Sequence, residues 1–172
     1  MKRKIITVLF IVLAFILQST LFNHFSFANI KPNLLIIVTS AFGFMRGRKE
    51  GMAVGVISGI FVDIFWGGLL GFHALLYAVI GYMNGSFHRL FYEDDIKLPI
   101  ILIGLSDLLY SFIIYFCMFM LKGKFIFYFF LRKIMLSELV YTILITVVLY
   151  QLILYVNRKL QIEEQRSASK FV

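Results

Sequence analysis

The chain has 172 residues, of which 61% are hydrophobic, 17% are aromatic and only 15% are charged. A soluble domain of this length carries roughly 25% charged residues, so the composition excludes an ordinary water-soluble globule and indicates long segments in lipid. The net charge of +8 does not indicate nucleic-acid binding, because the Lys and Arg residues lie at the ends of apolar runs and are not gathered on one face.

The first apolar run follows three basic residues at positions 2–4, as in a secretory signal peptide. Ser26-Phe27-Ala28 has the small-x-small form of a cleavage site, but it lies far from the end of the apolar core and more membrane segments follow. We therefore expect Ile5–Phe22 to remain in the protein as its first membrane span.

The sequence predicts an all-α integral membrane protein with a single membrane domain over residues 1–156 and a short cytoplasmic polar tail over 157–172. An N-terminus inside places 12 of the 17 Lys and Arg residues in the cytoplasm, which favours both ends inside. The aromatic run in loop 122–133 is apolar but too short to cross, so we expect it to form an interfacial segment. Five or seven spans remain alternatives. The six predicted spans are about 5–24, 32–45, 51–67, 69–85, 98–121 and 133–156.

Small residues recur every four positions in the third and fourth predicted spans. Gly51, Gly55 and Gly59 lie along one side of the third, and Tyr77, Gly81 and Gly85 along one side of the fourth. Almost no loop separates these spans, so they are expected to pack antiparallel. Rows of small residues let helix backbones approach closely, and we expect the two rows to face each other; a groove for another protein is the alternative.

Polar side chains from five spans are predicted to share the outer third of the membrane, and Asp107 lies nearer its middle. Charged groups at such depth need partners, and Asp63 with His73 is the expected pair. The layer either fixes the register of the helices, receives a partner's helix or lines a small-molecule pocket. Its five members are Gln18, Asn33, Asp63, His73 and Glu138.

A basic turn separates the second and third predicted spans. It contains Arg46, Arg48 and Lys49 around Gly47. Such a turn anchors topology and attracts anionic lipid, by about 1 kcal/mol for each charge. It is also the best candidate for a contact with a cytoplasmic protein.

Motifs of soluble enzymes are absent from the sequence: no P-loop, no GxSxG, no HExxH and no paired Cys/His set. The single Cys117 excludes an intramolecular disulfide. We therefore expect neither an enzyme nor a protein with a metal or cofactor.

An ordered series of motifs resembles the rod shape-determining protein MreD family over residues 18–85. It begins with QSTLF at 18–22, KPNLL at 31–35 and RGRKEG at 46–51. It continues with Gly55, Gly59, Asp63, Gly67-Gly68, Leu70-Gly71, Ala74-Leu75, Tyr77 and Gly81-Tyr82. The last two predicted spans resemble the family only in composition.

The resemblance implies a multi-pass protein of the bacterial cytoplasmic membrane that acts as a non-enzymatic scaffold of the elongation machinery. It implies binding to the single-span protein MreC and work with the MreB filament, RodA and a class B penicillin-binding protein in lateral peptidoglycan synthesis. It also implies a six-helix bundle similar to the substrate-binding subunits of energy-coupling-factor transporters. A solute-binding transporter component with a pocket in the outer half of the membrane is the alternative function.

Overall fold

The computed structural model describes residues 2–24, 32–66, 70–90, 96–117 and 135–168. Within these ranges the protein is helical and has no strand, so the predicted all-α class is confirmed. Six α-helices and one 3-10 turn are defined. They are α1 (Lys2–His24), α2 (Leu34–Arg46), α3 (Arg48–Phe65), α4 (Phe72–Ser86), η2 (Phe87–Leu90), α5 (Lys97–Tyr115) and α7 (Leu136–Ala168).

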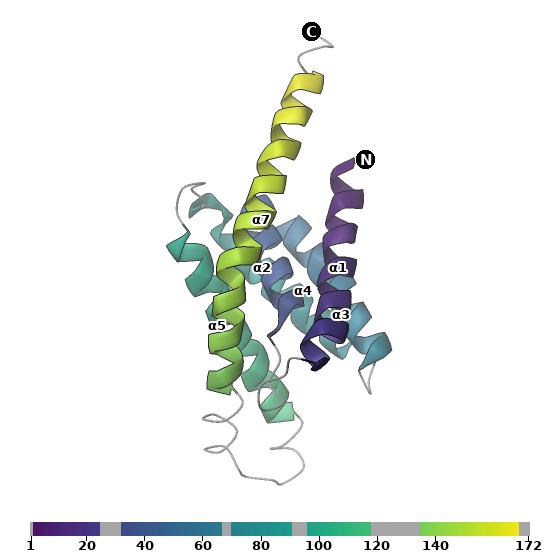
Figure 1. Ribbon diagram of the computed structural model, residues 1–172, viewed down its shortest axis with the longest axis vertical. Coiled ribbons are helices and arrows are strands. Elements are labelled where there is room, and N and C mark those ends of the chain that lie inside the picture. The colour runs from purple at the N-terminus through teal and green to yellow at the C-terminus, as the bar shows by residue number, and fades with distance from the viewer. Residues whose placement is uncertain (1, 25–31, 67–69, 91–95, 118–134, 169–172) are drawn as a thin grey trace.

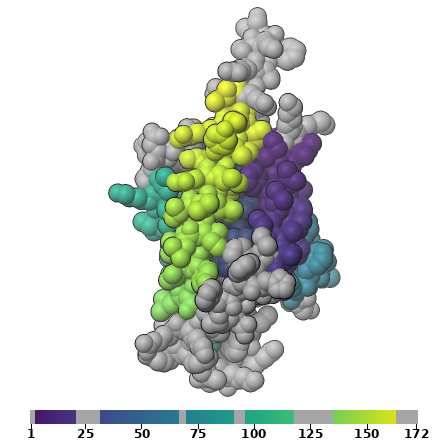
Figure 2. Space-filling view, in the orientation of Figure 1, coloured from purple at the N-terminus to yellow at the C-terminus, as the bar shows by residue number. Residues whose placement is uncertain are grey.

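The helix α2 is the centre of the molecule. Every side chain from Leu34 to Met45 is buried, and α2 contacts α1, α3, α4, α5 and α7. Figure 2 shows α1 and α7 covering one face of the molecule, with only a small area of α2 visible between them. A helix that is apolar on all sides is stable only when neighbours surround it, and α2 has that sequence.

Helix length divides the predicted spans into two groups. Among the described residues, three helices are long and apolar enough to cross a membrane, namely α1, α5 and α7. The 13 residues of α2 and the 15 of α4 reach only about 20 Å and 22 Å, less than the ~30 Å of a hydrocarbon core. The predicted second and fourth spans therefore form helices that are shorter than the bilayer.

The beginning of α1 and the end of α7 lie at the same end of the molecule, which we call the terminal end (Figure 1). The sequence predicted a polar tail from residue 157, but helix α7 continues to Ala168. Asn157 and Leu160 are buried, so side chains of this extension still pack on the protein. The predicted interfacial loop 122–133 lies outside the described residues.

The helices α3 and α4 pack through their glycines. A Cβ atom added at Gly55 would collide with the carbonyl oxygen of Tyr77, and one at Gly51 with that of Gly81. A Cβ at Gly59 would collide with the backbone of Ala74, and one at Gly85 with that of Arg48. The structure thus places the two small-residue rows against each other, with backbone on backbone, as small-residue helix contacts in membranes allow.

Gly43 of α2 joins the same contact. A Cβ there would lie 2.7 Å from the carbonyl oxygen of Gly81, closer than side chains tolerate. Three helices therefore meet at Gly81 without an intervening side chain. This close packing fixes the positions of α2 and α4 relative to α3, and hence the positions of the polar groups at their ends.

Candidate functional site

Asp63, near the end of α3, caps the beginning of α4. Its Oδ2 accepts hydrogen bonds from the backbone N–H groups of Gly71 (2.9 Å) and Ala74 (3.1 Å), and its Oδ1 accepts one from that of His73 (3.0 Å). The first N–H groups of a helix have no partner within the helix, and a carboxylate also suits its positive end. Since α4 begins at Phe72 in an apolar bundle, Asp63 replaces the water that would otherwise solvate these groups.

His73 completes the environment of the Asp63 carboxylate. Its Nδ1 lies 2.8 Å from Oδ1 of Asp63, and both residues are buried. The pair expected from the sequence is therefore formed. With four polar partners, Asp63 turns inward and does not face lipid.

The beginning of α2 is capped in a similar way by two side chains. Asn33 is the N-cap, and its Oδ1 accepts from the backbone N–H of Ile36 (3.3 Å). Gln18 of α1 accepts from the backbone N–H of Leu35 through Oε1 (3.2 Å). Oδ1 of Asn33 also accepts the hydroxyl proton of Tyr77 (2.8 Å). Gln18 and Asn33 thus hold the start of the central helix against α1 and α4.

Aromatic rings connect these caps to α5. The ring of Tyr110 lies 5.3 Å from that of Tyr77 and 6.2 Å from that of His73, measured between centroids. On α7, the hydroxyl of Thr142 accepts from the backbone N–H of Asn33 (3.3 Å). We call Gln18, Asn33, Asp63, His73, Tyr77 and Tyr110 the cap cluster. It joins α1, α2, α3, α4 and α5.

Glu138 lies on the contact between α5 and α7. The hydroxyl of Ser111 donates to its Oε2 at 3.2 Å. Asp107, also on α5, is buried with its side chain near Thr142. Glu138 therefore joins two helices, but it makes no described hydrogen bond to a cap residue.

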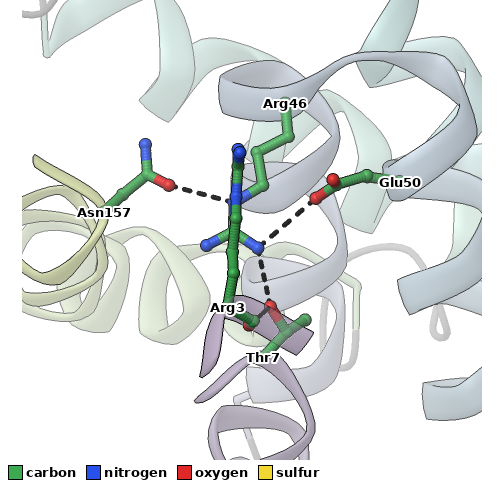
Figure 3. A network of polar contacts seen from close by, with 5 residues as sticks. All are labelled: Arg3, Thr7, Arg46, Glu50 and Asn157. Atoms are coloured by element: carbon green, nitrogen blue, oxygen red, sulfur yellow. Dashed lines mark hydrogen bonds and ion pairs between the residues drawn. The ribbon is translucent and has the colours of Figure 1, made fainter. Parts of the chain in front are cut away.

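Arg46 occupies the terminal end and contacts four helices (Figure 3). Its Nε donates to Oδ1 of Asn157 on α7 (2.9 Å), and its Nη1 donates to the hydroxyl of Thr7 on α1 (2.6 Å). Nη1 also lies 3.4 Å from Oε2 of Glu50 on α3. The guanidinium packs 4.4 Å from the ring centroid of Phe42. The planar fork of arginine suits several partners at once, and we call Thr7, Arg46, Glu50 and Asn157 the arginine cluster.

Asn84 makes a third polar connection, between the two ends. Its Nδ2 lies within donating distance of the hydroxyl oxygens of Ser40 on α2 (3.2 Å) and Ser106 on α5 (2.7 Å). Asn84 is 3% exposed. The helices α2, α4 and α5 are therefore joined by one buried amide.

These polar groups hold helices together. The Asp63 carboxylate and Nδ1 of His73 contact each other at a helix start, and no reactive hydroxyl or thiol is described as bonded to either. In the described part of the chain, no three His, Cys, Asp or Glu side chains are placed to hold a metal ion. The arrangement is that of a structural framework.

Comparison with known proteins identifies the family. Residues 1–159 match the sequence profile described as rod shape-determining protein MreD. The chain belongs to the MreD family. No curated protein and no solved structure matches it. Family membership gives this protein a role in rod shape determination and a place in a bacterial membrane.

In this MreD family member, four of the five residues of the predicted polar layer belong to the cap cluster. The predicted polar layer contains Gln18, Asn33, Asp63 and His73 within the cap cluster, whereas Glu138 bonds only to Ser111 among the described contacts. Three of the four cap residues serve helix N-termini. The predicted second and fourth spans begin close to the starts of α2 and α4, but sequence spacing did not show that these residues cap those starts.

The three basic residues of the predicted turn differ in their exposure. The side chain of Arg46 is only 2% exposed, whereas Arg48 and Lys49 are exposed. Arg48 lies over the ring of Tyr82 at 5.5 Å from its centroid. The side chain of Arg46 therefore packs within the protein, whereas Arg48 and Lys49 lie on its surface.

Sequence reasoning missed several polar residues that lack charge. Thr7 and Asn157 bind Arg46, Asn84 joins three helices, and Thr142 binds Asn33. A single Thr or Asn in an apolar helix is common and gives no spacing signal. The polar side of Asn84 was visible in the sequence, but its partners lie 44 and 22 residues away along the chain.

Proposed function

We propose that this protein is a non-enzymatic scaffold of the elongation machinery in the bacterial cytoplasmic membrane. The observation that carries the proposal is the family match over residues 1–159. The contacts support it, because the buried polar groups are used to fix helices and not to form a reactive centre. Such a rigid bundle can hold partner proteins in fixed positions during lateral peptidoglycan synthesis.

The terminal end faces the cytoplasm in this proposal. Arg46, Arg48, Lys49, Arg158 and Lys159 belong to helices at or near that end, and cytoplasmic segments of membrane proteins carry an excess of Lys and Arg. Both chain ends are then inside, and the cap cluster lies toward the outer side. The exposed Arg48 and Lys49 are offered to cytoplasmic components, among them the MreB filament.

The face formed by α1 and α7 is proposed to bind an MreC-like single-span protein. These two helices lie side by side on one face (Figure 2) and are the least buried of the three long apolar helices. Leu9 on α1 is 54% exposed and Leu144 on α7 is 63% exposed. Exposed aliphatic side chains on two neighbouring helices offer a surface along which a third helix can pack. RodA and the class B penicillin-binding protein are reached directly or through this partner.

Photo-crosslinking in membranes tests this face. A photoreactive residue at Leu9 or Leu144 is expected to capture the MreC-like partner, whereas the same residue at the buried Ile11 or Ile153 is expected to capture only the protein itself. Equal capture from all four positions, or capture from neither exposed position, would contradict the proposed face.

Depletion in a rod-shaped host tests the function as a whole. The cells are expected to become round, because lateral wall synthesis loses its membrane organiser. Unchanged shape with loss of uptake of one nutrient would instead favour the solute-binding alternative. The described residues do not favour that alternative, since Gln18, Asn33, Asp63 and His73 bond to groups of the protein itself.

A further inference from the structure

A cavity of about 480 Å³ opens between the first turns of α1 and α3 at the terminal end. Three cationic side chains line it, Arg3 and Lys4 from α1 and Arg46 from α2, together with one carboxylate, Glu50. If each is ionised, the lining carries a net charge of +2 (three cations and one anion). An enclosed surface of this charge attracts an anion more strongly than the same residues spread over an open face.

The described ring contacts between α1 and α3 lie beyond the cavity, toward the end of α3. There the ring of Phe15 lies 5.4 Å from that of Phe61, 4.9 Å from that of Phe65 and 5.1 Å from that of Trp66, measured between centroids. No such ring contact is described between their first turns. The two helices leave space where the basic residues lie.

The Arg46 guanidinium is already fixed in position at the edge of this cavity. Asn157 and Thr7 hold it from α7 and α1, as Figure 3 shows with Arg3 alongside. A cation held by the fold loses little further freedom when it binds an anion. Lys4, in contrast, is exposed and can reach a ligand at the mouth.

The remaining walls of the cavity are apolar. They consist of Val8 from α1 and Ala53, Val54 and Ile57 from α3. Val8 is 43% exposed, so the apolar wall continues onto the outer surface of the bundle. A cationic wall and an apolar wall in one cavity suit a ligand with an anionic head and a hydrocarbon chain better than they suit a small hydrophilic anion.

We propose that this cavity binds the phosphodiester headgroup of an anionic phospholipid, with an acyl chain along Val8 and Ala53. Basic pockets between membrane helices on the cytoplasmic side are known to suit anionic headgroups. The site is separate from the partner-binding face on α1 and α7, and lipid binding can be measured without any partner. Its failure would therefore leave the scaffold proposal untouched.

Native mass spectrometry of the purified full-length protein tests the site. Phosphatidylglycerol is titrated into detergent micelles that contain the protein, and phosphatidylcholine serves as the uncharged comparison. We expect one saturable phosphatidylglycerol site. Replacing Lys4 with Gln is expected to weaken binding about fivefold, the factor that one charge near a membrane surface is worth.

Two control substitutions, Met52→Phe and Lys49→Gln, distinguish binding in the cavity from effects of surface shape and surface charge. Ala53→Phe fills the cavity and is expected to abolish the saturable site, while Met52→Phe on the adjacent exposed position of α3 leaves it intact. Lys49→Gln removes an exposed charge of α3 that does not line the cavity, and is expected to leave the affinity unchanged. The surface substitution Lys4→Gln still tests the proposal if the cavity-filling variant Ala53→Phe fails to fold.

The proposal is overturned by equal retention of the two lipids, or by equal effects of Lys4→Gln and Lys49→Gln. A further arm adds inorganic phosphate as competitor. Full competition at concentrations close to those of the lipid would show that the ligand is free phosphate, and this too would overturn the lipid assignment. Retention of phosphatidylglycerol in excess phosphate supports it.

Discussion

Asp63 and Arg46 each make several hydrogen bonds that join one helix to another. Asp63 accepts three backbone hydrogen bonds and contacts His73, and Arg46 joins α2 to α1, α3 and α7. In an apolar bundle such groups have no water to replace a lost partner. A small change at either side chain therefore affects several helices at once.

Replacing Asp63 with Ala is expected to lower the free energy of unfolding by about 2–3 kcal/mol, because buried N–H groups at the start of α4 lose a charged acceptor. Asp63→Asn keeps the size but retains one acceptor oxygen, and an intermediate loss is expected. Thermal unfolding of the detergent-purified protein measures both. Glu50→Gln is the control, since Glu50 is 48% exposed and such pairs contribute less than about 1 kcal/mol. A monodisperse Asp63→Ala protein that has normal stability and still binds its partner would contradict this stabilising role of Asp63.

Arg46→Gln is expected to destabilise the protein more than the double change of Arg48 and Lys49 to Gln. Gln cannot bind Asn157 and Thr7 together in the positions that the guanidinium occupies, whereas Arg48 and Lys49 are exposed. Arg46→Lys is also expected to destabilise the protein, because an ammonium group lacks the planar fork of donors that binds Asn157 and Thr7 together. Unfolding temperatures of the three variants test the order. If the double variant is the weakest, the basic turn acts as a unit at the surface.

At the scale of helices, the packing of α3 on α4 depends on glycines at positions where backbone meets backbone. The position of each glycine in its row could be predicted from spacing by four, and so could the pairing of the two rows, because Gly67-Gly68 leaves almost no loop. The contact of Gly43 with α4 could not be predicted, since α2 has no second glycine to form a row. Only the folded structure shows that Gly43 meets Gly81.

Gly55→Ala and Gly81→Ala are each expected to cost about 1–3 kcal/mol, the range for overpacking a close contact. At both sites the added Cβ atom meets backbone, which cannot move aside. Gly104→Ala is the matched control, because its Cβ would lie 3.5 Å from the side-chain tips of Ile143 and Leu139. Replacing a helical glycine with alanine there is expected to be neutral or stabilising. Equal losses at all three positions would contradict the explanation from close backbone contact.

At the scale of the whole molecule, hydropathy predicted the order of the helices in the described part of the chain, and the basic residues predicted that both ends share one side. Hydropathy could not predict that α2 is enclosed on all sides, because a lipid-facing helix and a protein-enclosed helix are equally apolar. The same ambiguity hid the roles of Gln18 and Asn33. Their partners are backbone groups of α2, and its starting residue is not visible from hydropathy alone.

Reporter fusions at the two ends test the proposed orientation. Green fluorescent protein fluoresces only when it folds in the cytoplasm, and alkaline phosphatase is active only outside. We expect fluorescence and no phosphatase activity at both ends, because the basic groups gather at the terminal end. Phosphatase activity at one end alone would require an odd number of crossings and would restore the five- or seven-span arrangement.

The enclosure of α2 has a consequence for biosynthesis. The helix emerges from the ribosome as the second segment, yet two of the helices that surround it, α5 and α7, are made last. With about 20 Å of length and no outward-facing side chain of its own, α2 has no stable place in the bilayer until they arrive. We therefore expect a nascent or truncated chain that lacks α7 to expose the otherwise enclosed α2, and to be a substrate for insertion chaperones and membrane proteases until synthesis is complete.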